Sequence, residues 1–159
     1  MLKSLNLPEY SFKFKKDGDA PQIFDEIRKK YVALTPEEWV RQHFLMYLVK
    51  EKKFPSSLLL VEASLRYNGM SRRADIVAYD QQGKPLLVVE CKAPSVEINQ
   101  QTFDQVARYN MVLDVSYLVV TNGMKHYCCL LEHGEKSYHF LEEIPDFKEI
   151  KNHPMKTGK

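Results

Sequence analysis

The sequence predicts an α/β fold in which helices cover both faces of a central mixed β-sheet. Three observations predict it: a capped helix begins near residue 36, three strand-like segments with short polar links follow, and a second helix separates them from another apolar strand. Short links favour antiparallel hairpins, whereas a helix between two strands permits a parallel crossover. Helices on both faces are the natural way to bury such a sheet.

The N-terminal part is predicted to hold a short strand and a short helix. Residues 10–15 alternate apolar and basic side chains, which is the period of a strand with one solvated face. Residues 16–19 have the composition of a turn. Residues 23–31 are interpreted as a short helix with Ile23 and Ile27 facing inward.

The strongest helix signal begins at Thr35, which can cap the helix and is followed by a proline at the first helical position. Glu38 can complete a capping box and is otherwise expected at the rim. Glu37 falls on the same stripe as Val40 and Arg41. A carboxylate at the end of an apolar stripe makes Glu37 a candidate site residue.

The remaining elements follow from apolar patterning and turn residues. The tail after residue 145 is polar and expected to fray, so a single domain is predicted over residues 1–145, followed by a polar tail over residues 146–159. The expected strands are 58–65, 74–79, 85–93, 117–123, 126–131 and 138–141, and a helix begins at Asn99 or Thr102 and ends near residue 113.

Length and composition are those of an ordinary single-domain globular protein. The 159 residues suit one domain with one core, and the net charge of +2 neither requires nor excludes a nucleic-acid partner. No apolar run approaches the roughly 18 residues of a membrane span, and residues 1–6 lack the long apolar core and the cleavage site of a secretory signal. Three cysteines without paired spacing argue against a disulfide framework and favour a cytoplasmic location.

Charged side chains interrupt an otherwise apolar strand at Glu90 and Lys92. Side chains alternate along a strand, so these two share one face, whereas Val89 and Cys91 point into the core. Asp75 lies in the preceding strand, and a hairpin between the two strands would bring it near Glu90. Burying such charges without a purpose would be costly.

Converging carboxylates predict a site for a hard cation such as Mg²⁺, which keeps several waters and leaves room for a substrate phosphate. A water made more acidic by the ion can attack phosphorus. Lys92 can stabilise the negative charge that develops on the phosphate. Asp75, Glu90 and Lys92 are therefore predicted to hydrolyse phosphodiesters, with Glu37 as a possible third carboxylate.

These residues also carry a resemblance. Asp75 followed by Glu90-Cys91-Lys92 resembles the core of the PD-(D/E)XK nuclease superfamily. The segments TPEEWVR from Thr35, RADIV from Arg73, VECKAP from Val89 and TNG from Thr121 resemble the N-terminal nuclease domain of type I restriction enzyme R (motor) subunits. The similarity runs from about residue 10 to residue 145.

The resemblance implies a restriction-endonuclease-like fold and cleavage of double-stranded DNA with Mg²⁺, or Mn²⁺ as a substitute. It implies that Asp75 and Glu90 are metal ligands, that Lys92 is the catalytic lysine, and that Gln105 and Tyr109 form a Q-x-x-x-Y pair. Glu37 matches the helical acid of many members. The implied partners are the motor, specificity and methylation subunits of a restriction system. The chain has no phosphate loop of the G-x-x-x-x-G-K-[ST] type, so the motor activity is not expected within it.

Several alternatives stay open. Arg72 and Arg73 are interpreted as DNA-binding residues, although they could belong to a solvated turn. Glu90 and Lys92 could be an exposed ion pair, and Gln105 and Tyr109 ordinary helix residues. His126, Cys128, Cys129 and His133 imitate a zinc set, but their spacing matches no standard finger, and adjacent cysteines on a strand face opposite ways.

Two other functions compete with the endonuclease. One is a nuclease-like module without catalysis that docks DNA or a protein, and the other is a repair or junction-resolving nuclease. The repair nuclease differs from the restriction endonuclease only in its substrate. The oligomeric state is open.

Overall fold

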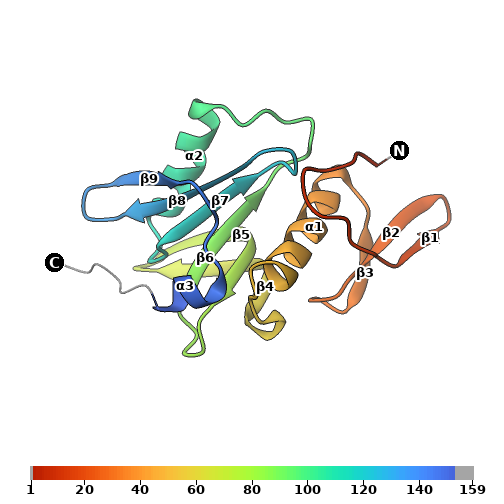
Figure 1. The fold of residues 1–159 in the computed structure, drawn as a ribbon, viewed down its shortest axis with the longest axis horizontal. Coiled ribbons are helices and arrows are strands. Elements are labelled where there is room, and N and C mark those ends of the chain that lie inside the picture. The colour runs from red at the N-terminus through yellow and green to blue at the C-terminus, as the bar shows by residue number, and fades with distance from the viewer. Residues whose placement is uncertain (1, 153–159) are drawn as a thin grey trace.

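The computed structural model describes residues 2–152, which form a six-stranded mixed sheet, a separate three-stranded sheet and three α-helices (Figure 1). In the large sheet the strands follow one another in chain order, from β4 to β9. All neighbours are antiparallel except β6 and β7, which are parallel. The strands are β4 (Leu59–Tyr67), β5 (Met70–Tyr79), β6 (Pro85–Cys91), β7 (Tyr117–Thr121), β8 (His126–Glu132) and β9 (Ser137–Leu141), with a short 3-10 turn η1 (Ser56–Leu58) before β4.

Helices cover both faces of this sheet, as the sequence predicts. Helix α1 (Pro36–Lys50) and the short α3 (Phe147–Asn152) bury their apolar residues in one core, and α2 (Gln100–Met111) buries its own in a second core on the other face. The first core includes Phe44, Leu48, Ile76, Val89 and Phe147. The second includes Val88, Phe103, Ala107, Leu118 and Val120. The predicted α/β fold class is confirmed.

Helix α2 forms the crossover that connects the parallel, directly paired strands β6 and β7. All five residues of β7 are buried. Such an inner strand, covered on both faces, tolerates a continuous apolar run. Asn99 caps α2 by accepting a hydrogen bond from the backbone N–H of Thr102 at 2.8 Å, so the helix begins at the earlier of its two predicted starts.

The β4–β5–β6 hairpins set the register of the candidate site. Ile76 pairs with Val89, so Asp75 and Glu90 are the next residues along the two strands. On its other side, the β4–β5 ladder passes from the Val61–Ile76 pair to the Ala63–Ala74 pair. Glu62, which lies between them, has a positive φ of 54°, and this irregularity falls opposite Asp75.

The prediction of a helix over residues 23–31 is wrong. The region forms an antiparallel sheet of β1 (Phe14–Asp17), β2 (Ala20–Asp25) and β3 (Lys30–Ala33), which Figure 1 shows beside α1. The Asp25 carboxylate accepts hydrogen bonds from the backbone N–H groups of Ile27 and Arg28, both at 2.8 Å. This local turn competes with a helix. The strand expected over residues 10–15 begins only at Phe14.

Helix α1 begins as predicted, but Glu38 does not lie at the rim. Thr35 caps the helix by accepting a hydrogen bond from the Glu38 N–H at 3.0 Å. The Glu38 side chain is buried, with 4% of the residue exposed, and accepts hydrogen bonds from three neighbouring side chains instead of completing a capping box. These neighbours are Arg28, Arg41 and Gln42.

The C-terminal region is more ordered than its composition suggests. The sequence predicts fraying after residue 145, yet α3 forms and buries Phe147 and Ile150 in the core beneath α1. These two apolar residues lie three apart, on one side of a helix. Residues 153–159 of the predicted tail lie outside the described residues. No helix within residues 2–152 is long and apolar enough to cross a membrane.

Candidate metal and phosphate site

Asp75 and Glu90 lie side by side on β5 and β6, where the sequence predicts them. Both carboxylate oxygens of Asp75 are engaged: Oδ1 accepts from Arg41 Nη1 at 2.7 Å, and Oδ2 accepts from the backbone N–H of Cys91 at 2.7 Å. Glu90 Oε2 accepts a long hydrogen bond of 3.4 Å from Asn110 Nδ2 on α2. Asp75 is thus tied to α1 and Glu90 to α2.

The surroundings of Glu90 disfavour its negative charge. Burial raises the pKa of Glu90 to about 8, together with the charge of Asp75 and a hydrogen bond between the two carboxyl groups. Asn110 and the charge of Lys92 oppose this rise in pKa. A cation between the carboxylates would favour the ionised form.

The Glu90 carboxyl faces an open cleft of about 360 Å³ between β5, β6 and α2. The lining residues are Arg73, Glu90, Lys92, Gln105, Val106 and Tyr109. Five of these six are residues that the sequence singles out, so one cavity collects most of the predicted site. Gln105 and Tyr109 lie one turn apart on the exposed side of α2 and both reach the cleft.

Lys92 follows the end of β6 directly, and its backbone N–H donates to the Thr121 carbonyl at 2.8 Å. Its positive charge acts on both Glu37 and Glu90, where it opposes the rise in their pKa values. The loop after Lys92 is tied to the turn that follows β7, because Asn122 Nδ2 donates to the Val96 carbonyl at 2.7 Å. The backbone around Lys92 is therefore fixed from both sides.

Glu37 lies at the start of α1 and is exposed. Partial burial raises its pKa, and the nearby charge of Asp75 adds to this rise. Within residues 2–152, no three His, Cys, Asp or Glu side chains are placed to share one metal ion. Glu37 is thus close enough to Asp75 for their charges to interact, but the described part of the structure does not arrange three carboxylates around one metal position.

Arg72 and Arg73 differ in their surroundings. The guanidinium of Arg72 lies 4.6 Å from the centre of the Tyr109 ring, and its Nε donates to the Tyr109 carbonyl at 2.9 Å. Arg72 therefore braces the C-terminal end of α2. The Arg73 side chain is 68% exposed, lines the cleft and lies 3.7 Å from Glu62. Arg73 is the better placed of the two to reach a phosphate.

Sequence reasoning misses two residues of the site. The sequence places Arg41 only on a stripe of α1, yet this residue holds Asp75. Asn110 is 1% exposed and donates to Glu90, while its Oδ1 has no hydrogen-bond partner among the described residues. The sequence does carry a signal for Asn110: this polar residue lies three positions after Ala107, a spacing that places it on the buried face of α2.

The residues of the zinc-like set are distributed over separate environments. Cys128 and Cys129 belong to the cores on opposite faces of the sheet, as the alternation of a strand predicts. His126 contacts Thr121 Oγ1 at 2.7 Å and the Asn6 carbonyl at 2.8 Å. His133 contacts the backbone carbonyls of Met111 and Val115. Both histidines thus join backbone segments.

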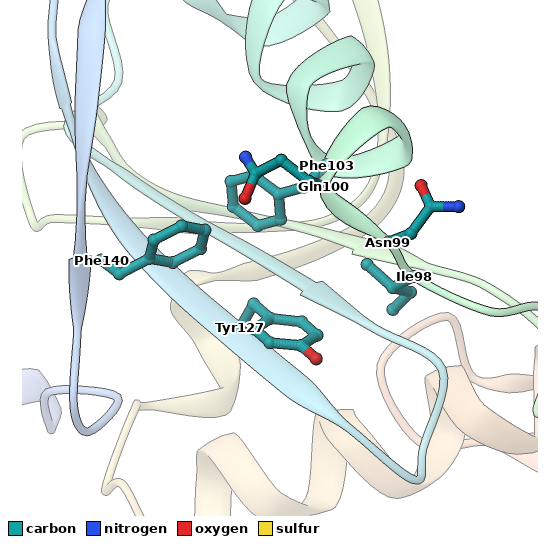
Figure 2. Close-up of a pocket in the computed structure, with 6 residues that line it drawn as sticks. All are labelled: Ile98, Asn99, Gln100, Phe103, Tyr127 and Phe140. Carbon is teal, nitrogen blue, oxygen red and sulfur yellow. The ribbon is translucent and has the colours of Figure 1, made fainter.

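A second cavity of about 120 Å³ lies between the start of α2 and strands β8 and β9. Figure 2 shows the rings of Phe103, Tyr127 and Phe140 around it, with Asn99 and Gln100 at the helix end. Among the described residues, no carboxylate or basic side chain lines this pocket. The residues that line it therefore lack the charged groups that would bind a cation or a phosphate.

Comparisons with known proteins place the domain in a family. Residues 36–145, more than half of the chain, match the family model described as "Type I restriction enzyme R protein N terminus". A search of curated proteins finds no match. The fold resembles a fragment named as the HsdR subunit of a type I restriction enzyme from Vibrio vulnificus YJ016, with a TM-score of 0.52, 19% identity and coverage of 74% of this chain.

This chain spans 25% of the length of the Vibrio fragment. A complex of DrdV with DNA is also similar, at a TM-score of 0.47 and 15% identity over 77% of this chain and 12% of that one, which is too distant to bear on the fold. The family match covers α1, the strands β4 to β9 and α2, and so includes every residue of the candidate site. The chain belongs to the family of type I restriction enzyme R protein N-terminal domains.

Proposed function

We propose that this domain is a metal-dependent DNA endonuclease that hydrolyses phosphodiester bonds. The observation that carries the proposal is the meeting of the Asp75 and Glu90 carboxyl groups, of which Glu90 lines an open cleft together with Lys92. Membership of a restriction-enzyme family supports DNA as the substrate. Strongly perturbed acids in a cleft are typical of functional sites.

Asp75 and Glu90 would hold Mg²⁺, or Mn²⁺ in its place. Their chemistry fits the ion, because Mg²⁺ is usually held by one or two carboxylates and completes its shell with water and phosphate. When bound, the ion would acidify a water molecule and neutralise charge on the phosphate. Glu37 stays a candidate for a further ligand, supported by its electrostatic contact with Asp75.

The other residues of the cleft suit a phosphate. Lys92 would stabilise the charge that develops on the phosphate oxygens during attack. Gln105 would orient Lys92 or the attacking water, and the Tyr109 hydroxyl would donate to a phosphate oxygen. Arg73 would contact the DNA backbone, whereas the role of Arg72 would be to support Tyr109.

The natural substrate in this proposal is double-stranded DNA, delivered with the help of other subunits. A net charge of +2 gives the domain little general attraction for DNA. We therefore propose that motor, specificity and methylation subunits of a restriction system supply most of the binding. The three buried cysteines, which are free thiols, suit a reducing cytoplasm.

The direct test is cleavage of supercoiled plasmid by the purified protein with Mg²⁺ or Mn²⁺. We expect the wild type to nick or linearise the plasmid and a metal chelator to stop it. Lys92→Ala is expected to lower the rate at least about 100-fold, because it removes charge stabilisation at the phosphate. Asp75→Ala and Glu90→Ala should have effects at least as large.

Lys84→Ala is the matched control. Lys84 lies in the loop at the other end of the β5–β6 hairpin, where its ammonium group makes a long ion pair of 4.0 Å with Asp114. The Lys84→Ala substitution should leave the cleavage rate unchanged. A folded Lys92→Ala variant that cleaves at the wild-type rate would contradict the proposed role of Lys92. A wild type that binds DNA but neither binds metal nor cleaves would favour the non-catalytic module.

A further inference from the structure

A largely buried group of polar and charged side chains adjoins Asp75. It joins the small N-terminal sheet to α1 and to β5. Charged residues are rarely buried so completely unless they are paired. The members are Asp25, Arg28, Glu38, Arg41 and Gln42, of which Asp25 is 0%, Gln42 1%, Glu38 4% and Arg41 7% exposed.

Arg41 is the member that connects this group to the candidate site. Its Nη1 donates to Asp75 Oδ1 at 2.7 Å, while its Nη2 and Nε donate to the two carboxylate oxygens of Glu38. Burial alone would lower the pKa of Arg41, but the hydrogen bonds and charge of Glu38, together with the charge of Asp75, raise it instead. One guanidinium therefore bridges two carboxylates.

The position of Glu38, and through it of Arg41, is fixed by its neighbours. Gln42 Nε2 donates to Glu38 Oε2 at 2.7 Å and to Asp25 Oδ2 at 2.9 Å. Arg28 donates to Glu38 Oε2 at 2.9 Å and to Asp25 Oδ2 at 2.6 Å. Although burial would raise the pKa of Glu38, the hydrogen bonds from Arg41 and Gln42 keep it below its usual range. Glu38 is thus a stable anion that anchors Arg41.

Asp75 is consequently held from two directions. Arg41 binds one oxygen, and the backbone N–H of Cys91, the residue after Glu90, binds the other. These two contacts set the plane of the carboxylate relative to β6. An unfixed carboxylate next to Glu90 could turn away from it and so relieve the repulsion that the cation is meant to neutralise.

We propose that Arg41 is a positioning residue that holds the Asp75 carboxylate beside Glu90 in the orientation needed for the metal ion. The proposal rests on the proposed function and adds a residue to it. Hydrogen bonds to a metal-binding carboxylate commonly contribute tenfold to a hundredfold to metal affinity or activity. A lysine at this position keeps the charge, but its single ammonium lacks the planar fork that spans Asp75 and Glu38.

The test compares Arg41→Lys with Arg66→Lys, a control on the exposed part of β4. Mn²⁺ is titrated into each protein without DNA and followed by calorimetry. We expect Arg41→Lys to weaken Mn²⁺ binding about tenfold, and Arg66→Lys to leave it unchanged. In the cleavage assay, Arg41→Lys should need more Mn²⁺ for half-maximal rate and should recover most of the rate at saturating Mn²⁺.

The outcomes separate this inference from the proposed function. If the wild type binds no Mn²⁺, the proposed function fails and this inference fails with it. If the wild type binds Mn²⁺ and folded Arg41→Lys binds it equally well, only the inference is overturned. Should Arg41→Lys not fold, Glu38→Gln replaces it: a several-fold loss of Mn²⁺ affinity supports the positioning role, and an unchanged affinity overturns it.

Discussion

Glu90 is the last residue but one of the mostly buried strand β6, and its surroundings raise the pKa of its carboxyl group to about 8. Burial makes the largest contribution, and the charge of Asp75 adds to it. The folded protein thus holds a proton on Glu90 that the unfolded chain releases near pH 4.5, the ordinary value for this group. Stability from this residue therefore falls as the pH rises between these two values.

Glu90→Gln tests this linkage in the metal-free protein. Glutamine has no charge to bury, so the variant should be more stable than the wild type at pH 8.5, by about 2 kcal/mol, since each pKa unit corresponds to roughly 1.4 kcal/mol and partial solvation reduces the sum. The advantage should shrink steadily as the pH is lowered toward 5. Urea unfolding of both proteins at several pH values measures it. A stability difference that is independent of pH would contradict the raised pKa of Glu90.

The residues of the cleft are predictable because they follow local rules. The alternation of side chains along β6 and into the residue after it predicts Glu90 and Lys92 on one side, and a short link between β5 and β6 brings Asp75 next to Glu90. Arg41 could not be assigned in the same way. Its partners Glu38 and Asp75 lie 3 and 34 residues away in the chain, and the second contact depends on how α1 docks against β5.

At the scale of elements, the turn between β7 and β8 shows how the N-terminal segment is fastened to the sheet. The backbone N–H of Asn6 donates to the Gly123 carbonyl at 2.8 Å. Gly123 has a φ of 86°, and a Cβ atom at this position would lie 2.8 Å from Leu5 Cδ2 and 3.1 Å from Val40 Cγ2. Glycine is required here both for its backbone conformation and for the close approach of two side chains.

Gly123→Ala and Gly83→Ala separate these two causes. Gly83 has a similar φ of 83°, but a Cβ atom there would meet open space, so its substitution should cost only the backbone strain of about 1 kcal/mol. Gly123→Ala should cost about 1 kcal/mol more, since Leu5 and Val40 must move. Chemical denaturation measures both losses. Equal losses would show that the N-terminal segment does not press on this turn.

The elements that the sequence predicts correctly are formed by interactions between residues close together in the chain, whereas the others depend on distant partners. Helix α1 and the β4–β5–β6 hairpins carry their own caps and turns and form near their predicted positions, although β5 begins at Met70 instead of residue 74 and β6 ends at Cys91 instead of residue 93. Residues 23–31 carry a helix-like spacing of Ile23 and Ile27, but they form strands because Asp25 turns the chain and is buried against α1. That burial depends on a distant partner, Gln42, which local patterning cannot reveal.

At the scale of the whole molecule, the fold brings together at the candidate site residues from the helices on both faces of the sheet. Helix α1 supplies Arg41 from one face, α2 supplies Gln105, Tyr109 and Asn110 from the other, and β5 and β6 supply the carboxylates between them. The small N-terminal sheet adds Asp25 to the charged group that adjoins Asp75. The site thus depends on every layer of the molecule.

The most direct test of the central claim is a crystal structure of the wild type soaked in Mn²⁺, with an anomalous difference map collected at a wavelength where manganese scatters strongly. We expect a peak in contact with the carboxylates of both Asp75 and Glu90, beside Lys92. An ordered site without such a peak at a saturating Mn²⁺ concentration, or a peak only at other residues, would contradict it.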